Sequence, residues 1–269
     1  MIKQYIRPLK LAEALQLAKQ PATIAIAGGA MAFRGFDLPY ETMVDLQAIP
    51  ELNHIETYDT TLEFGGACSL QRVLDTPDLP QALKQALRRT IPRNIRNNTS
   101  IGESLQVDAP PREWLAGLAA LDAGVRFGED EVVHPLIELL ENNALRQGVI
   151  CAVFIPKIEP GEALSASYVA RTPADEPIVN VAAFVRVDNA NIVETAFAAF
   201  CGVSTQVVTV IHLENLEGHL FNHDTIAQTV KPIPALLNPP NDYKGSSAYR
   251  REMATVCLRR ALESALQAV

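Results

Sequence analysis

Helical and strand-like spacings of apolar residues alternate over the first part of the chain. The i, i+3, i+4, i+7 spacing of one helical face is followed by Leu11, Ala14, Leu15 and Ala18. Strand-like runs precede this helix at 3–7 and follow it at 23–27 and 42–46, and prolines stand near the element ends. The pattern predicts a small βαβ-type lobe over residues 1–55.

The pattern changes to short alternating runs after residue 53. The runs at 54–58 and 61–67 meet at Asp59-Thr60, which predicts a hairpin. Helices are expected after Pro80 and after Pro110-Pro111. Further strands are expected at 125–127, 131–134 and 149–155. These elements predict a second lobe over residues 56–163, built on an antiparallel sheet.

The last part of the chain combines long strands with a long helix. Apolar runs at 178–187 and 191–200 flank Asp188-Asn189, a turn pair that closes hairpins. Ser246 or Ser247 can cap a final helix. One face of that helix carries Ala254, Leu258, Ala261, Leu262, Ala265 and Val269. We therefore expect a third lobe over residues 164–269, a sheet packed by helices, in a chain of α+β class.

Two glycine-bearing bends are candidate ligand sites. Gly28-Gly29 ends the strand at 23–27, and glycine allows backbone N–H groups to turn outward. The stretch 96–105 is predicted to form a second polar bend with one glycine, followed by the start of a strand. Together the bends predict one phosphate-bearing ligand held between two loops. Two ordinary tight turns without a ligand are the alternative.

Composition and charge exclude some classes of function. The 269 residues carry a net charge of −8, which argues against a nucleic-acid or anionic-membrane surface. A local basic run, interpreted as one helical face, consists of Lys84, Arg88, Arg89, Arg93 and Arg96. The sequence has neither an apolar signal-peptide core nor an apolar run of membrane-spanning length. The expected location is the cytoplasm.

The cysteines and histidines do not predict a metal site. Cys68, Cys151, Cys201 and Cys257 lie far apart and are expected to be buried thiols. His219 and His223 are four residues apart but have no clear third ligand, so an exposed loop or helix end is favoured over zinc.

The order of these features resembles a known family. The motifs that carry the likeness are Tyr5-Ile-Arg-Pro8, Ala27-Gly28-Gly29, Ile95-Arg96-Asn97, Ser100-Ile101-Gly102, Leu121-Asp122-Ala123, Arg171-Thr-Pro-Ala-Asp175 and Ser247-Ala-Tyr-Arg250. Their colinear arrangement resembles the FAD-binding medium subunits of molybdenum hydroxylases, the xanthine dehydrogenase and carbon monoxide dehydrogenase flavoprotein family. The resemblance implies that the first two lobes form a PCMH-like FAD-binding domain.

The resemblance also implies which residues contact FAD. One jaw around the flavin diphosphate would consist of Ala27, Gly28, Gly29, Ala30, Met31, Ala32 and Phe33. The other would consist of Thr99, Ser100, Ile101, Gly102, Glu103 and Ser104. Glu113 stands where the family supplies an Asp to the flavin. The sequence departs from the family at Ala30, which replaces a small polar residue, at Glu103, which replaces a glycine, and at Tyr168, which replaces a basic residue.

The implied function is electron transfer without a catalytic residue in this chain. FAD would receive electrons from an iron–sulfur subunit, since the dispersed cysteines cannot bind a cluster. A molybdenum-cofactor subunit would oxidise a small heterocycle, aldehyde or similar substrate, and NAD, oxygen, a quinone or another compound would accept the electrons. A flavin-poor or flavin-free paralogue that serves as a docking subunit is the second hypothesis. An unrelated small-molecule-binding α/β protein is the third.

Overall fold

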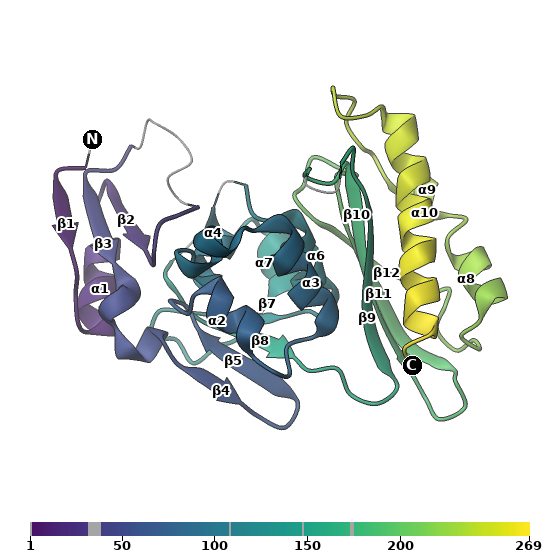
Figure 1. The fold of residues 1–269 in the computed structure, drawn as a ribbon, viewed down its shortest axis with the longest axis horizontal. Helices are drawn as coiled ribbons and strands as arrows, with labels where there is room; N and C mark the ends of the chain where they lie inside the picture. Colours follow the sequence, from purple (N-terminus) through teal and green to yellow (C-terminus); the bar gives the residue numbers. More distant parts are fainter. Residues whose placement is uncertain (1, 32–38, 108, 147, 173–174) are drawn as a thin grey trace. The chain divides into compact units, whose positions relative to one another are not determined.

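The computed structural model describes residues 2–31, 39–107, 109–146, 148–172 and 175–269 (Figure 1). The chain forms two compact units, each assembled from several segments. Unit 1 contains Met1–Leu79, Ile91–Pro111 and Asp122–Lys157, and unit 2 contains Pro80–Thr90, Arg112–Leu121 and Ile158–Val269. The division into lobes 1–55, 56–163 and 164–269 stays a prediction.

Unit 1 begins with the expected βαβ arrangement. Strands β1 (Gln4–Ile6), β2 (Thr23–Ile26) and β3 (Thr42–Asp45) form a parallel sheet in the order β1-β3-β2. Helix α1 (Leu11–Ala18) connects the first two strands, and its buried Ala14 belongs to the same apolar cluster as Val44 of β3. Because β2 runs directly into Gly28, the glycine bend lies at the carboxyl end of a strand, where α/β folds bind ligands.

The second sheet of unit 1 is antiparallel, as predicted. Its strand order is β4-β5-β8-β6-β7. The strands are β4 (Ile55–Thr57), β5 (Thr61–Gly65), β6 (Gly124–Phe127), β7 (His134–Pro135) and β8 (Ile150–Pro156). The predicted strand at 131–134 is wrong except at His134, because the Asp130 side chain accepts a hydrogen bond from the Val132 N–H (3.1 Å) and holds a turn there.

Several short helices were not predicted or were predicted as another element. The apolar residues after the second bend form helix α5 (Ile101–Gln106) and not a strand, because the Ser100 hydroxyl caps the helix by accepting the Glu103 N–H (3.1 Å). The sequence analysis also missed α2 (Leu70–Asp75), α4 (Arg93–Asn97) and α7 (Leu136–Glu141). Helices this short show too few apolar positions for their period to be recognised.

The basic run does not form one helical face, so that interpretation is wrong. Lys84, Arg88 and Arg89 belong to α3 (Gln81–Thr90), whereas Arg93 and Arg96 belong to α4, which follows Pro92. Arg96 is buried, and its Nε donates to Gln71 Oε1 (3.0 Å). Its guanidinium also donates to the backbone carbonyl of Ile91. The run therefore includes a structural arginine in the interior of unit 1.

Unit 2 contains one antiparallel sheet with the strand order β12-β11-β10-β9. Its strands are β9 (Glu162–Val169), β10 (Val179–Val187), β11 (Val193–Cys201) and β12 (Thr209–His212). The predicted hairpin between β10 and β11 is confirmed. Asp188 Oδ1 accepts the N–H groups of Ala190 and Ile192, both at 2.8 Å, which fixes the turn.

Helices cover both faces of this sheet (Figure 1). On β10, Val179, Val181, Ala183 and Val185 join the apolar cluster formed with α10 (Ser247–Leu266). Helices α3 and α6 (Arg112–Ala120) lie against the opposite face, on strands β9, β10 and β11. Helices α8 (His223–Thr229) and α9 (Ile233–Leu236) pack beside α10. A strand covered on both faces needs the nearly continuous apolar run that the sequence shows.

The final helix packs on the sheet as predicted, and Ser246 is its cap. The Ser246 hydroxyl accepts the Tyr249 N–H at 3.2 Å. The buried positions include Ala254, Leu258, Ala261, Leu262 and Ala265. Val269 lies beyond the helix end and is exposed, so its assignment to the buried face is wrong. None of the helices in the described ranges is both long and apolar enough to cross a membrane.

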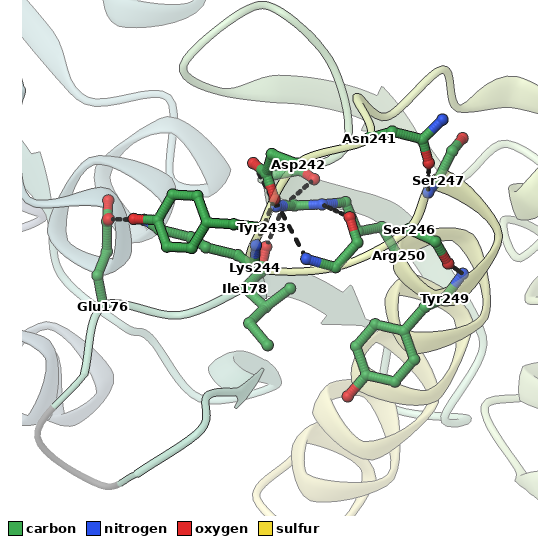
Figure 2. Close-up of polar contacts among 12 residues, drawn as sticks. Glu176, Ile178, Asn241, Asp242, Tyr243, Lys244, Ser246, Ser247, Tyr249 and Arg250 are labelled. Carbon is green, nitrogen blue, oxygen red and sulfur yellow. Dashed lines mark hydrogen bonds and ion pairs between the residues drawn. The ribbon is translucent and has the colours of Figure 1, made fainter.

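Arg250 connects the start of α10 to the residues just before β10 and just after β11. Figure 2 shows its contacts with Ile178 and Asp242. Its side chain is 2% exposed, and Nη1 donates to the carbonyls of Ile178 (2.7 Å) and Gly202 (2.9 Å). Nη2 donates to both carboxylate oxygens of Asp242, at 2.7 and 2.8 Å. A fork of fixed donors satisfies four acceptors from separate segments, so this arginine has a structural role.

Asp242 should make the stability of unit 2 depend on pH. Hydrogen bonds from Arg250 lower the pKa of the Asp242 carboxyl below its ordinary value. Because the folded-state pKa is the lower one, this stabilisation is complete above about pH 4 and is lost as the pH falls further. We expect Asp242→Asn to lower stability at neutral pH, and the difference from the unmodified chain to shrink on acidification. Urea unfolding at neutral and acidic pH measures the free energy of unfolding of both chains. If the difference between them did not change with pH, the stabilising role of the Asp242 carboxylate would be contradicted.

Candidate diphosphate-binding loops and the Glu113 cluster

The first glycine bend needs glycine for two physical reasons. Gly28 and Gly29 have φ values of +105° and +78°, in the left-handed region that L side chains rarely adopt. A Cβ on Gly28 would also lie 2.3 Å from the carbonyl oxygen of Asn98. The bend therefore presses against the residue that opens the second loop. Met31, which follows, is buried at 4% exposure.

Substituting Gly28 with alanine should disturb this contact. We expect Gly28→Ala to lower the free energy of unfolding by about 2 kcal/mol or more, because both the positive φ and the collision with the Asn98 backbone must be relieved. Gly218→Ala is the matched control, since Gly218 also has a positive φ (+74°) but open space around its Cβ position. Equal losses for the two variants in urea unfolding would show that the collision contributes nothing.

The second loop turns directly into helix α5, and its residues are buried. Exposures range from 0 to 8% for Thr99, Ser100, Ile101, Glu103 and Ser104, and Gly102 is buried as well. The Ile101 N–H donates to the Cys68 carbonyl (2.8 Å) and the Gly102 N–H to the Gly66 carbonyl (3.0 Å). The Ser104 hydroxyl donates to the Ile101 carbonyl at 2.7 Å. The Thr99 hydroxyl oxygen is buried and has no hydrogen-bond partner among the described residues.

The structure brings the two loops together within unit 1. Glu103 Oε2 accepts the Gly29 N–H, and Oε1 accepts the Met31 N–H, each at 2.9 Å. The Ala30 N–H donates to the carbonyl of Asn98 at 3.0 Å. Two of the proposed cofactor residues, Ala32 and Phe33, lie outside the described residues. Sequence reasoning missed Asn98, whose contribution comes from its backbone and leaves no trace in residue type.

A diphosphate does not fit the loops in this arrangement. Outward N–H groups on a glycine bend form an anion-binding concavity. Here the Gly29 and Met31 donors already bind a carboxylate, and the Ala30 donor binds a carbonyl. A phosphate group at the same donors would meet the negative charge of Glu103 at close range. The loops therefore have the shape of an anion cradle whose described donors are taken by the chain itself.

Glu113 belongs to unit 2, where it forms a buried ion pair with Arg89. Arg89 Nε donates to Glu113 Oε2 at 2.7 Å, and Nη2 pairs with Oε1. The Arg89 guanidinium lies over the ring of Tyr168, 3.9 Å from the centroid. The side chains of Arg89 and Glu113 are 18% and 7% exposed. The position at which a basic residue was expected therefore carries an aromatic ring that stacks on an arginine from α3.

A pocket of about 400 Å³ lies beside this pair in unit 2. Its lining includes Arg89, Glu113, Tyr168 and Asn180. Asn180 is 1% exposed, and within the described part of the chain both polar atoms of its side-chain amide have no hydrogen-bond partner. Sequence reasoning missed Arg89 and Asn180. Arg89 was interpreted as one member of the basic run. For Asn180, the signal in the sequence was its polar side chain inside the apolar run at 178–187.

The cysteines are buried thiols, as the sequence predicts. Burial raises the pKa of the Cys151 and Cys257 thiols to about 11 and that of Cys201 to about 12. Burial also raises the pKa of Cys68. The thiolate is the form that binds metals and attacks electrophiles, so these positions are suited to packing.

Solved structures of other proteins have the same fold as this chain. The chain superimposes on carbon monoxide dehydrogenase from Hydrogenophaga pseudoflava with a TM-score of 0.82 and 22% identity, over 99% of this chain and 98% of that one. For quinoline 2-oxidoreductase from Pseudomonas putida 86 the TM-score is 0.81 with 23% identity, over 100% and 98% of the two chains. The predicted α+β fold of PCMH-like FAD-binding type is confirmed.

Sequence comparison identifies the family. Residues 1–158 match the FAD binding domain in molybdopterin dehydrogenase, and residues 166–265 match the CO dehydrogenase flavoprotein C-terminal domain. The chain therefore belongs to this family of FAD-binding proteins. It is 23% identical to the glyceraldehyde dehydrogenase medium chain of Sulfolobus acidocaldarius over 96% of both chains. It is 25% identical to the uncharacterized protein YgfM of Escherichia coli K12, over 95% of this chain and 93% of that protein.

Proposed function

We propose that this chain is the medium subunit of a molybdenum hydroxylase-type complex. In that complex it would take part in electron transfer from an iron–sulfur subunit to an external acceptor such as NAD. The observation that carries the proposal is that the chain matches both domains of the family, over residues 1–158 and 166–265.

The cysteines support the assignment of the other redox centres to partner subunits. All four are buried singly with raised pKa values, which suits packing and not the binding of an iron–sulfur cluster. The iron–sulfur centres and the molybdenum cofactor would therefore be held by other chains. Free thiols also suit a reducing compartment, which supports a cytoplasmic location.

A second candidate function is supported by Glu103. Its carboxylate occupies the backbone donors that would bind the flavin diphosphate. A medium subunit closed in this way could keep the fold and hold the iron–sulfur partner in place with little or no flavin. This docking role requires the same complex but not the same cofactor content.

Isolation of the complex from cells tests both candidates. We expect an affinity-tagged chain to co-purify with an iron–sulfur subunit and a molybdenum-cofactor subunit. Flavin released by denaturation, in an amount comparable to that of the chain, would support the electron-transfer role. An assembled complex with little flavin would support the docking role. A chain that purifies alone would contradict both.

A further inference from the structure

Glu103 binds the first loop in the way that a phosphate group would. Its two carboxylate oxygens accept from the N–H groups of Gly29 and Met31, at 2.9 Å each, and the residue is only 8% exposed. Alternate N–H groups of a glycine bend that point at one anion form a nest. A carboxylate that spans two such donors is a charged ligand within the chain.

The surrounding backbone leaves little freedom for a different arrangement of the loops. The Ala30 N–H is held by the Asn98 carbonyl, and the Gly28 Cα lies so close to that carbonyl that a Cβ would collide with it. Glu103 itself is fixed at the start of α5, where its N–H donates to the Ser100 hydroxyl (3.1 Å). The part that can move away without disturbing the backbone is the Glu103 side chain.

An anion tethered to the chain is a strong competitor for the loop. Its effective concentration is set by the short covalent connection and reaches at least the millimolar range. A dissolved dinucleotide must displace it, because the carboxylate and a phosphate cannot share the same donors. The charge of Glu103 and its position thus both disfavour the binding of a dinucleotide at this loop.

We propose that Glu103 is a built-in occupant of the diphosphate cradle and competes with FAD for it. The inference rests on the proposed function in one respect, since it takes the cradle to be the FAD site. FAD enters the loop when the Glu103 side chain leaves it. The unmodified chain therefore binds FAD weakly, and the affinity is set by this displacement.

Titration of the purified full-length chain with FAD, followed by flavin fluorescence, tests the proposal. We expect Glu103→Ala to lower the dissociation constant for FAD by roughly 10- to 100-fold, the range that a lost charged competitor with two hydrogen bonds implies. Glu141→Ala removes an exposed carboxylate from α7 of the same unit and should leave the affinity unchanged. Riboflavin, which has no diphosphate, should bind the two variants and the unmodified chain equally.

Two results would overturn the proposal. Glu103→Ala could bind FAD no more tightly than the unmodified chain does, or the substitution could increase the affinity for riboflavin as much as that for FAD. Failure of the proposed function is a separate result, because it is read from the subunits that co-purify with the chain. An assembled complex combined with no gain in Glu103→Ala would reject the inference alone.

Hydrogen exchange provides a readout that does not depend on FAD. We expect the amides of Gly29 and Met31 to be protected in the unmodified chain and to exchange at least tenfold faster in Glu103→Ala. Glu103→Gln keeps the side-chain volume and one acceptor oxygen, so it replaces the alanine variant if that variant does not fold. We expect one of the two amides to lose its protection from exchange in Glu103→Gln. Unchanged protection in both variants would show that Glu103 does not hold the loop.

Discussion

Replacement of Arg250 with methionine is expected to lower the free energy of unfolding by about 3–5 kcal/mol, because it leaves two buried backbone carbonyls without their donor and removes the charge-assisted hydrogen bonds to Asp242. The arginine is 2% exposed and binds Asp242 and the carbonyls of Ile178 and Gly202. The methionine side chain is similar in length to that of arginine. The loss of stability in Arg250→Met would therefore come from lost hydrogen bonds and not from a large cavity. Urea unfolding monitored by circular dichroism measures the effect.

Two further variants make this prediction specific. Arg259→Met changes an exposed arginine of the same helix and should alter stability by less than about 0.5 kcal/mol. Arg250→Lys keeps the charge but cannot reproduce the planar fork, so it should recover a small part of the loss. If Arg250→Met were no more destabilising than Arg259→Met, the network in Figure 2 would not stabilise unit 2.

Replacement of Glu113 with alanine is expected to destabilise unit 2 by about 3 kcal/mol, because it leaves the Arg89 guanidinium without its carboxylate in a mostly buried place. Burial already lowers the pKa of Arg89 below its ordinary value. The stacking of Arg89 on Tyr168 remains in the variant and does not neutralise the charge. The result would give Glu113 a structural role in addition to its proposed cofactor contact.

A double-mutant cycle separates the ion pair from other effects. Arg89→Met combined with Glu113→Ala removes both charges, and we expect the double variant to be more stable than Glu113→Ala alone. Arg88→Met, at an exposed position of the same helix α3, is a control for the change in charge. A double variant that loses the sum of both single losses would mean that Arg89 and Glu113 do not depend on each other.

Strong periodic patterns could be read from the sequence. The βαβ unit, the antiparallel hairpins and the final helix each repeat apolar residues over several turns or strand positions. The apolar pattern of the buried face therefore predicted both the type of each element and its position in the sequence. The two bends were found because glycine has a backbone role that residue type reveals, and Gly28 and Gly29 do have positive φ values. These features depend on neighbours in the chain.

Elements with weak apolar patterns, and contacts between distant residues, could not be predicted from the sequence. Strand β9 was missed because its edge position leaves alternate side chains partly exposed among small residues. Helix α5 was taken for a strand because its six residues follow a cap that also suits a turn. From the sequence, Glu103 was only a carboxylate that replaces a glycine beside the predicted phosphate site, whereas the structure places this carboxylate on the N–H donors of the other loop.

By itself, the sequence determined the class of fold, the family and the positions of the two loops, because these follow from local periodicity, glycine placement and the order of motifs. The tertiary structure decided which groups the loops contact. It paired Glu103 with Gly29 and Met31, Arg89 with Glu113, and Arg250 with the carbonyls next to the ends of two strands. Such pairings join residues far apart in the chain, and their energies depend on burial and distance, which no local pattern records.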